Sequence, residues 1–198
     1  MKYLKPLIGV TVFLWLLLGL AYPLVMTGIS QLAFPYQANG SQVKLNGRVV
    51  ASAIVGQYFN QKGYFWGRPS DTVNATTLKP QPYNAANSGS SNYGPTNRAL
   101  INTIKARIAH LEKTNPGLKV SQIPPDLVEG SASGLDPNIS VQAAVIQIPR
   151  VARATGLSHS YLRTLVSQAT SGPQWGLFGR RLVNVTALNI DVYKARHG

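Results

Sequence analysis

The sequence contains no cysteine, and this absence excludes a whole group of functions. Without cysteine the chain has no disulfide, no thiol nucleophile and no thiolate metal ligand. Acidic residues are scarce as well, with 6 Asp and Glu against 19 Lys and Arg, which gives a net charge of +13. So few carboxylates leave few pairs for general acid–base catalysis.

Catalytic sequence motifs are also missing. The chain has no Gly-x-x-x-x-Gly-Lys, Gly-x-Gly-x-x-Gly, Gly-x-Ser-x-Gly or His-Glu-x-x-His pattern. His110, His159 and His197 lie on different predicted elements, and Asp126 and Glu129 fall in a short proline-rich connector. The sequence therefore predicts no catalytic residue, no metal site and no cofactor of its own. An exported hydrolase that uses serine is the least favoured alternative.

One long uncharged run dominates the N-terminal end. It extends from Leu7 to Met26, 20 residues, and the charges nearest to it are Lys5 and Lys44. A helix of about 20 residues rises roughly 30 Å, the thickness of the hydrocarbon core of a bilayer. The run therefore predicts a transmembrane helix.

A cleaved signal peptide is the alternative interpretation of the same run. Lys2 and Lys5 would form its positive region, residues 7–20 its apolar region, and Gly19-Leu20-Ala21 its cleavage site. The apolar run continues past Ala21, beyond the roughly 7–15 residues that are usual for a signal peptide. This length favours an uncleaved anchor.

The charges on either side of the span predict its orientation. Lys2 and Lys5 lie at its N-terminal end, and the other end stays uncharged as far as Lys44. An excess of Lys and Arg beside a span favours the cytoplasmic side. We therefore expect a single-pass protein of the bacterial inner membrane, with residues 1–34 as the anchor and residues 35–198 as one extracytoplasmic domain.

The remaining positive charge constrains the partners of that domain. Lys2 and Lys5 precede the span, so a net charge of about +11 remains on the rest of the chain. Such a balance often marks a nucleic-acid binder, but export argues against that partner. An anionic membrane surface or an acidic patch on a partner protein is favoured, and a solvated basic face without a partner is the alternative.

Local patterns predict both strands and helices, so the expected fold class is α+β. Val43 to Val55 reads as a hairpin with Asn46-Gly47 as its two-residue turn. The aromatic residues between Tyr58 and Trp66 indicate a core edge or, less favoured, a docking surface. Residues 67–95 lack periodicity and form an unusually long irregular segment, which tends to be functional or disordered.

The second half of the chain reads mainly as helix. Thr96 is the expected cap of a helix that ends near Lys113. A second helix is expected after Ser140, with a kink at Pro149 and an end at Gly156. Residues 162–169 predict another amphipathic helix, and residues 183–192 fit strand and helix spacing equally.

Several longer motifs occur in a fixed order along the chain. They are Val55-Gly56-Gln57, Tyr64-Phe65-Trp66-Gly67-Arg68-Pro69-Ser70, the run from Ser88 to Asn97, the run from Ser131 to Ser140, and Val183-Asn184-Val185. Together with the N-terminal span, this series resembles the C subunit (KdpC) of the bacterial Kdp potassium-transporting ATPase over nearly the whole chain. The sequence departs from the pattern of that family where Ser90 replaces a glycine, at Tyr93, and at Asn138.

The resemblance implies a non-catalytic subunit of a high-affinity potassium uptake complex. Its implied partners are a channel-like potassium-conducting subunit, a P-type ATPase subunit and a very small membrane subunit, together with the lipid bilayer. The family has been described as needed for assembly and as raising the affinity of the ATPase subunit for nucleotide. ATP would then be bound, if at all, through the ATPase subunit.

The resemblance also selects candidate residues. The candidate nucleotide-binding or partner-contact loop consists of Ser88, Gly89, Ser90, Ser91, Asn92, Gly94, Pro95, Thr96 and Asn97. The motif residues expected to be structural are Gly56, Gln57, Gly67, Arg68, Pro69, Ser70, Ser133, Gly134, Leu135, Asp136 and Pro137. An extracytoplasmic loop cannot reach a cytoplasmic nucleotide. Two alternatives therefore stay open: an outside subunit that assembles the complex or controls potassium access, and a cytoplasmic nucleotide-binding regulator.

Overall fold

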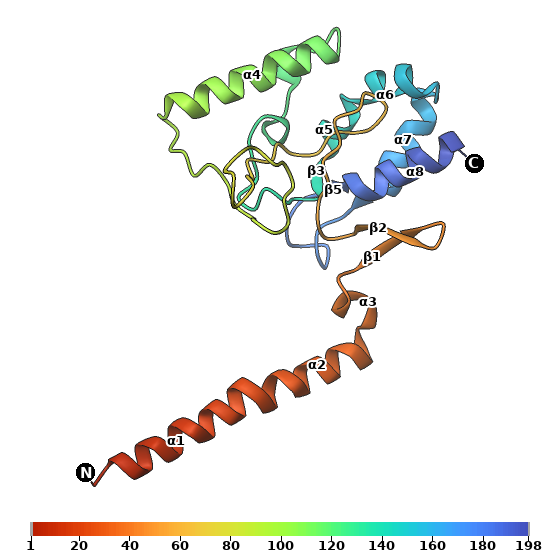
Figure 1. Ribbon diagram of the computed structural model, residues 1–198. Helices are drawn as coiled ribbons and strands as arrows, with labels where there is room; N and C mark the ends of the chain where they lie inside the picture. Colours follow the sequence, from red (N-terminus) through yellow and green to blue (C-terminus); the bar gives the residue numbers. More distant parts are fainter. Residues whose placement is uncertain (1, 198) are drawn as a thin grey trace. The chain divides into compact units, whose positions relative to one another are not determined.

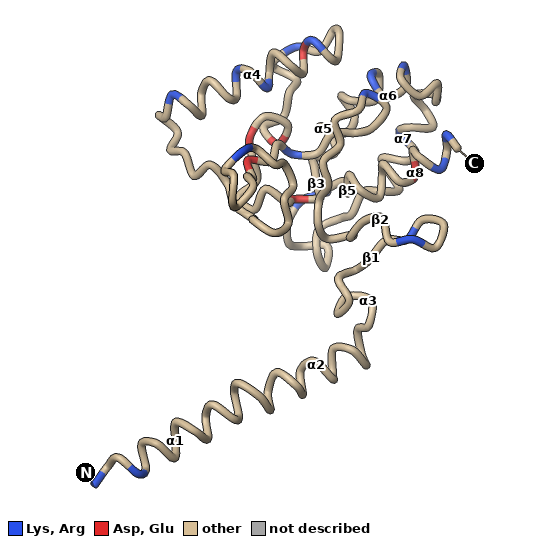
Figure 2. Tube along the Cα trace, in the orientation of Figure 1, with Lys and Arg blue, Asp and Glu red and all other residues tan. Residues whose placement is uncertain are grey.

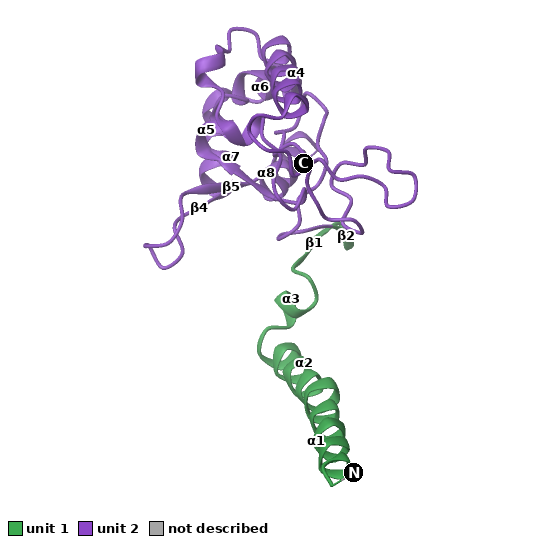
Figure 3. Cartoon of the chain, turned by 90° about the vertical axis from the view of Figure 1, so that its left-hand side faces the viewer, with its two compact units in different colours: residues 1–50 green, residues 51–198 purple. Residues whose placement is uncertain are grey.

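A computed structural model of the chain describes residues 2–197 (Figure 1). The chain divides into two compact units, Met1–Val50 and Ala51–Gly198 (Figure 3). The predicted fold class, α+β, is confirmed, because helices and short antiparallel strands both occur in the described chain.

The N-terminal unit is dominated by one helix of 30 residues, Leu4–Ala33, none of which is buried within the protein. It comprises α1 (Leu4–Leu16), a π-helical turn η1 (Leu17–Ala21) and α2 (Tyr22–Ala33). Pro23 lacks the N–H that would bond to residue 19, and Tyr22 N–H instead reaches Leu17 O, five residues back. The helix is long and apolar enough to cross a membrane and extends beyond the predicted span at both ends.

A short helix, α3 (Pro35–Ala38), and a hairpin follow the long helix. Strands β1 (Gln42–Leu45) and β2 (Arg48–Ser52) pair across a turn at Asn46 and Gly47. Both turn residues have positive φ, 50° and 78°, as a two-residue hairpin turn of this kind requires. The predicted hairpin is confirmed, although its second strand ends at Ser52, before Val55.

The second unit is built around a small antiparallel sheet in the order β3-β5-β4. Ile139 of β3 and Thr170 of β4 both pair with Val183 of β5, and the Ile139 and Val183 side chains are fully buried. The elements of this unit are β3 (Asn138–Ser140), α5 (Val141–Val145), α6 (Ile148–Thr155), α7 (His159–Gln168), β4 (Thr170–Ser171), β5 (Leu182–Asn184) and α8 (Val185–His197).

Local signals set most of the helix boundaries. Ser140 caps α5 by accepting from Ala143 N–H at 3.1 Å, and Gly156 ends α6 with φ of 77°, as predicted. The expected kink at Pro149 is a full division, with α5 ending at Val145 and α6 starting at Ile148. Residues 183–192 were predicted as either strand or helix, and they contain both, because β5 ends at Asn184 and α8 begins at Val185.

The helix α4 (Arg98–Thr114) requires one correction. Its cap is Asn97 instead of Thr96, because Asn97 has extended backbone angles and its Oδ1 accepts from Ala99 N–H at 2.8 Å. The connector after α4 contains two short 3₁₀ turns, η2 (Val120–Gln122) and η3 (Pro125–Leu127). Asp126 in η3 is buried and accepts from Ser140 Oγ, which joins the connector to the start of α5.

The backbone of the aromatic segment Tyr64-Phe65-Trp66 is bonded by side-chain amides in place of a neighbouring strand. Asn189 Oδ1 accepts from Phe65 N–H and its Nδ2 donates to Phe65 O, both at 2.8 Å. Gln147 does the same for Trp66, at 2.8 and 3.1 Å. Phe65 is fully buried, which confirms the predicted place in the core for this part of the aromatic run, whereas Tyr58 at its other end is exposed.

Arg150 is buried behind the same segment and has no carboxylate partner among the described residues. Its guanidinium donates to Lys62 O, Tyr64 O, Asn115 Oδ1 and Gln147 Oε1 at 2.6–3.2 Å. It also lies 3.9 Å from the ring centroid of Trp66. Burial lowers the pKa of Arg150 to about 10, so the guanidinium stays charged at neutral pH.

Candidate functional site

Three of the sequence motifs meet in the second unit at Arg68 and Asp136. Arg68 Nη1 lies 3.3 Å from Asp136 Oδ2, and Arg68 Nη2 donates to Gly130 O at 3.1 Å. Gly56 N–H donates to Leu135 O at 2.8 Å. The motif residues around positions 56, 68 and 136 therefore form one connected cluster. Both side chains of the ion pair are about a quarter exposed, so solvent screening limits what the pair contributes to stability.

Tyr83 lies at the centre of this cluster. Its hydroxyl donates to Arg68 O at 2.7 Å, and its backbone N–H donates to Ser70 Oγ at 2.8 Å. A Cβ on Gly67 would lie 2.5 Å from the Tyr83 hydroxyl, so only glycine fits at that position. Burial raises the pKa of Tyr83 well above its usual range, and the nearby negative charge of Asp136 adds to the effect. The phenol therefore stays protonated and acts as a hydrogen-bond donor.

The first part of the predicted loop packs against the Ser133-Gly134 motif. Gly89 N–H and Ser88 Oγ both donate to Ser133 O at 3.0 Å. Gly134 has φ of +66°, and a Cβ there would lie 2.4 Å from Thr72 Cγ2 and 2.8 Å from Gly89 O. This close approach explains a glycine at position 134 and joins two motifs that are 45 residues apart.

The second part of the predicted loop does not join the cluster. Ser90 Oγ donates to Asn92 Oδ1 at 3.1 Å and accepts from Asn92 N–H at 3.3 Å, so these contacts are local. Gly94, Pro95 and Thr96 are exposed and lead to α4, where Asn97 serves as the helix cap.

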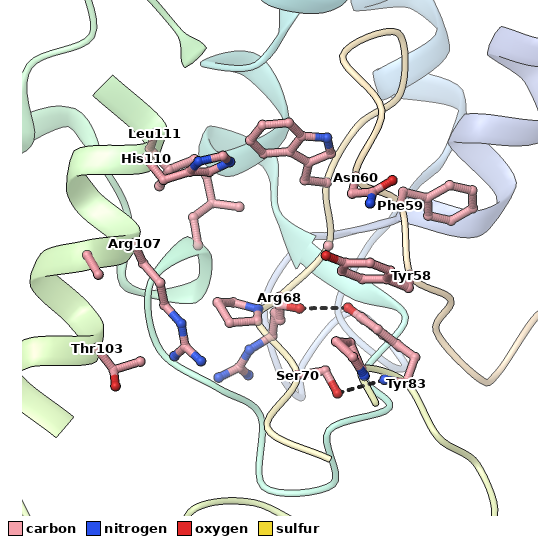
Figure 4. A pocket seen from close by; sticks show the side chains of 16 residues that line it. Tyr58, Phe59, Asn60, Arg68, Ser70, Tyr83, Thr103, Arg107, His110 and Leu111 are labelled. Carbon is pink, nitrogen blue, oxygen red and sulfur yellow. Dashed lines mark hydrogen bonds between the residues drawn. The ribbon is translucent and has the colours of Figure 1, made fainter. Parts of the chain in front are cut away.

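A cleft of about 480 Å³ lies beside the motif cluster, between α4 and the segments 58–60, 66–70 and 82–83 (Figure 4). Figure 4 shows His110 and Arg107 extending from α4 toward the cleft, with Tyr58, Arg68 and Tyr83 on the opposite segments. This volume falls in the range of small-ligand pockets, roughly 300–1,000 Å³. No residue of the predicted loop 88–97 lines it.

The cations of the cleft are already paired. Arg107 Nη2 forms an ion pair with Asp71 Oδ1, and Arg107 Nη1 donates to Val128 O at 3.0 Å. Arg68 is paired with Asp136. The other walls are mostly aromatic and aliphatic. His110 stacks on Trp66 with ring centroids 5.2 Å apart. Because its two arginines are neutralised within the protein, the cleft is better suited to a neutral aromatic or aliphatic group than to a polyanion.

The sequence did not single out the cleft, although one signal pointed to it. Thr103, Arg107 and His110 are spaced by four and three residues, which places them on one face of a helix. Tyr83 had no such signal, because it lies in an irregular stretch and its partners are distant in sequence. Within the described residues, no group of three or more His, Asp or Glu could hold a metal ion.

Four of the six acidic residues bond to other groups of the chain, which leaves few free negative charges on its surface. Asp71 and Asp136 pair with arginines, Asp126 accepts from Ser140, and Asp191 lies 3.4 Å from Lys194 Nζ. In Figure 2 the Lys and Arg positions along the helices and loops far outnumber the acidic ones.

These features define a class: a protein with one N-terminal helix able to span a membrane, and a small basic α+β domain that carries an aromatic cleft. Comparison with known proteins gives the family. The model of KdpC, described as the K⁺-transporting ATPase c chain, matches residues 4–194. The chain belongs to the KdpC family and is a subunit of a K⁺-transporting ATPase complex.

Similar proteins agree over the full length. The potassium-transporting ATPase KdpC subunit of Rhodopseudomonas palustris strain BisB18 is 47% identical over 201 residues, covering 99% of this chain and all of that protein. The KdpC subunits of Methylobacterium nodulans, 47% identical, and Dechloromonas aromatica, 46% identical, cover 96% and 94% of this chain and the same shares of their own. The resemblance noted in the sequence is thereby confirmed.

Proposed function

We propose that this chain is a non-catalytic accessory subunit that helps to assemble and stabilise a potassium uptake complex in the bacterial inner membrane. The helix Leu4–Ala33 anchors it with the N-terminus in the cytoplasm, and the domain acts outside. Its partners are the channel-like potassium-conducting subunit, the P-type ATPase subunit and the small membrane subunit of the complex.

The observation that carries this proposal is the long helix. It is strongly apolar over most of its 30 residues, and none of them is buried within the described chain. In water such a surface would be strongly unfavourable, at about 25 cal/mol per Å² of exposed apolar area. A bilayer and neighbouring membrane helices supply the environment that the chain itself does not.

The cleft and the basic surface support a role through protein contact. With Arg68 and Arg107 neutralised, the cleft can take an aromatic or aliphatic side chain from a partner subunit. A domain of high positive charge repels potassium ions at short range, and salt screens this repulsion beyond about 8–10 Å. We therefore expect the basic faces to lie toward acidic partner surfaces or head groups, and the uncharged residues 87–95 to lie nearest the ion entrance.

The contacts at the start of the loop do not favour the nucleotide-binding alternative. Gly89 N–H and Ser88 Oγ both donate to Ser133 O instead of pointing to a vacant anion position. Any effect of this subunit on nucleotide affinity would then act through a shared conformational equilibrium of the complex.

The side of the membrane decides between the two roles and can be tested by labelling. Because the chain has no cysteine, Ser167→Cys at an exposed position of α7 provides a single thiol. We expect a membrane-impermeant maleimide to label it in intact spheroplasts. Lys2→Cys is the matched control and should react only after lysis. Labelling of the Ser167 variant only after lysis would place the domain in the cytoplasm and overturn the proposal.

Assembly provides the second measurement. A variant without residues 1–34 should fail to co-purify with the potassium-stimulated ATPase, whereas the full chain should co-purify stoichiometrically. Arg68→Met with Asp136→Leu removes the ion pair beside the cleft without leaving one charge unpaired. If both variants support the same ATPase activity as the full chain, the role in assembly is wrong.

A further inference from the structure

The loop between β4 and β5, residues 172–181, presents apolar side chains to solvent. Trp175, Leu177 and Phe178 are 85%, 78% and 59% exposed, although they are among the largest apolar side chains of the domain. Figure 3 shows this loop projecting from the body of the second unit beyond β4 and β5. Solvated loops rarely gather three such residues, so the cluster marks an interaction surface.

The loop is ordered by its own hydrogen bonds. Gln174 and Phe178 exchange two backbone bonds of 2.8 and 3.0 Å, and Gly176 N–H donates to Pro173 O at 3.0 Å. Trp175 holds a positive φ of 54°, which is unfavourable for a large aromatic residue. The Trp175 and Phe178 rings are arranged edge to face, with their centroids 6.1 Å apart. The loop thus presents a preformed aromatic tip and needs no further ordering to bind.

The charges beside the tip indicate an anionic partner. Arg180 and Arg181 follow Phe178 after one glycine, are exposed, and form no ion pair within the described residues. Between Pro137 and Ile190 the sequence has no Asp or Glu, so nothing nearby in the chain neutralises them. Tryptophan at head-group depth with arginines on lipid phosphates is the pattern of a membrane-interface anchor.

The chain enters the second unit close to this loop. Asn184 Nδ2, three residues beyond Arg181, donates to Ala53 O at 2.8 Å. Ala53 lies 20 positions after Ala33, the last residue of the long helix. This segment reaches at most about 70 Å even if it is fully extended. A tether of this length keeps the loop at high effective concentration beside the bilayer that holds the helix.

We propose that residues 172–181 form a second membrane contact, in which Trp175, Leu177 and Phe178 enter the head-group region and Arg180 and Arg181 bind anionic lipid phosphates. This inference rests on the membrane anchor of the proposed function but not on the side that the domain occupies. It adds a lipid-binding surface that orients the domain over the bilayer.

The test uses the full chain, reconstituted alone into vesicles of phosphatidylcholine with or without phosphatidylglycerol. A nitroxide label at Leu177→Cys is compared with one at Leu78→Cys, a similarly exposed leucine in another loop (73%). In the anionic vesicles we expect the Leu177 label to collide with oxygen and to be shielded from a water-soluble nickel chelate. The Leu78 label should remain open to the chelate.

The arginines are tested in the same system. Each cation near an anionic surface is worth about 1 kcal/mol, so Arg180→Gln with Arg181→Gln should lower the ratio of inserted to free loop about 30-fold. Equal nickel accessibility of the Leu177 and Leu78 labels in both kinds of vesicle would overturn the proposal. So would shielding that appears only after the other subunits are added, because it would assign the loop to a protein interface. Because the chain is tested alone, failure here leaves the side-of-membrane experiment unaffected.

Discussion

Two aromatic clusters of this domain have similar composition and opposite environments. Tyr64-Phe65-Trp66 lies against the core, with Phe65 fully buried. The cluster of Trp175, Leu177 and Phe178 is the most exposed apolar group of the second unit. Both lie in segments that belong to no regular strand or helix, so neither hydrophobicity nor secondary structure explains the difference.

The hydrogen bonds of the backbone do explain it. The backbone N–H and C=O groups of Phe65 and Trp66 bond to the side-chain amides of Asn189 and Gln147. These backbone groups therefore have hydrogen-bond partners inside the core. The loop that carries Trp175 satisfies its backbone by its own turns, so it can stand away from the core. A buried backbone group without a partner costs about 1–3 kcal/mol. Whether an aromatic residue can be buried therefore depends on whether the core offers hydrogen-bond partners for its backbone N–H and C=O.

The largest expected effect is on the buried cluster. Phe65→Ala removes a fully buried ring and should lower the free energy of unfolding of the domain by about 3–5 kcal/mol. Phe178→Ala, the matched control in the exposed loop, should change it by no more than about 0.5 kcal/mol. Urea unfolding of the full chain in detergent micelles, followed by near-UV circular dichroism, measures both. Equal losses would contradict the comparison.

The next prediction concerns the two hydrogen bonds between the Asn189 side chain and the backbone of Phe65. Asn189→Leu keeps the volume but leaves Phe65 N–H and Phe65 O buried without partners, so we expect a loss of about 2 kcal/mol or more. Gln142→Leu removes the amide of an exposed glutamine, which makes one bond, to Gln122 O. This control should cost less than about 1 kcal/mol in the same urea experiment. If Asn189→Leu leaves the free energy of unfolding unchanged, the bonds of Asn189 do not hold the aromatic segment in place.

Tyr83 is an intermediate case, a half-buried aromatic residue whose hydroxyl is engaged. Tyr83→Phe should cost about 1 kcal/mol near neutral pH through the lost bond to Arg68 O. Because burial raises the pKa of the folded-state phenol above the unfolded value of about 10, its contribution is complete below that pH and declines above it. The difference in unfolding free energy between wild type and variant should therefore narrow above about pH 10. A difference independent of pH up to the alkaline limit would contradict this assignment.

The smallest expected effect has the opposite sign. Trp175→Gly relieves a positive φ that glycine adopts freely, so the domain should gain up to about 0.5 kcal/mol or stay unchanged. The same change should weaken the lipid contact of the loop, read from the nitroxide label at position 177. A clear loss of stability would show that the Trp175 side chain stabilises the domain instead of only facing solvent.

The sequence predicted the local elements well, because their causes are local. The apolar run, the Asn46-Gly47 turn, the start of a helix after Ser140 and the stop at Gly156 each depend on a few adjacent residues. Where two neighbours could do the same task, as with Thr96 and Asn97, backbone geometry decided. The candidate loop was only partly predictable: Ser88 and Gly89 join the motif cluster, whereas residues 90–97 form local contacts and the cap of α4.

By itself, then, the sequence determined the span, the family and the order of the elements, because composition and short-range pattern are sufficient for these. Tertiary structure alone decided that Tyr83 lies at the centre of the motif cluster. It also decided that Arg68 and Arg107 are neutralised beside a cleft, and which aromatic cluster lies inside. The physical reason is distance along the chain: Asn189 clamps Phe65 across 124 residues, and no local pattern records where such a partner will lie.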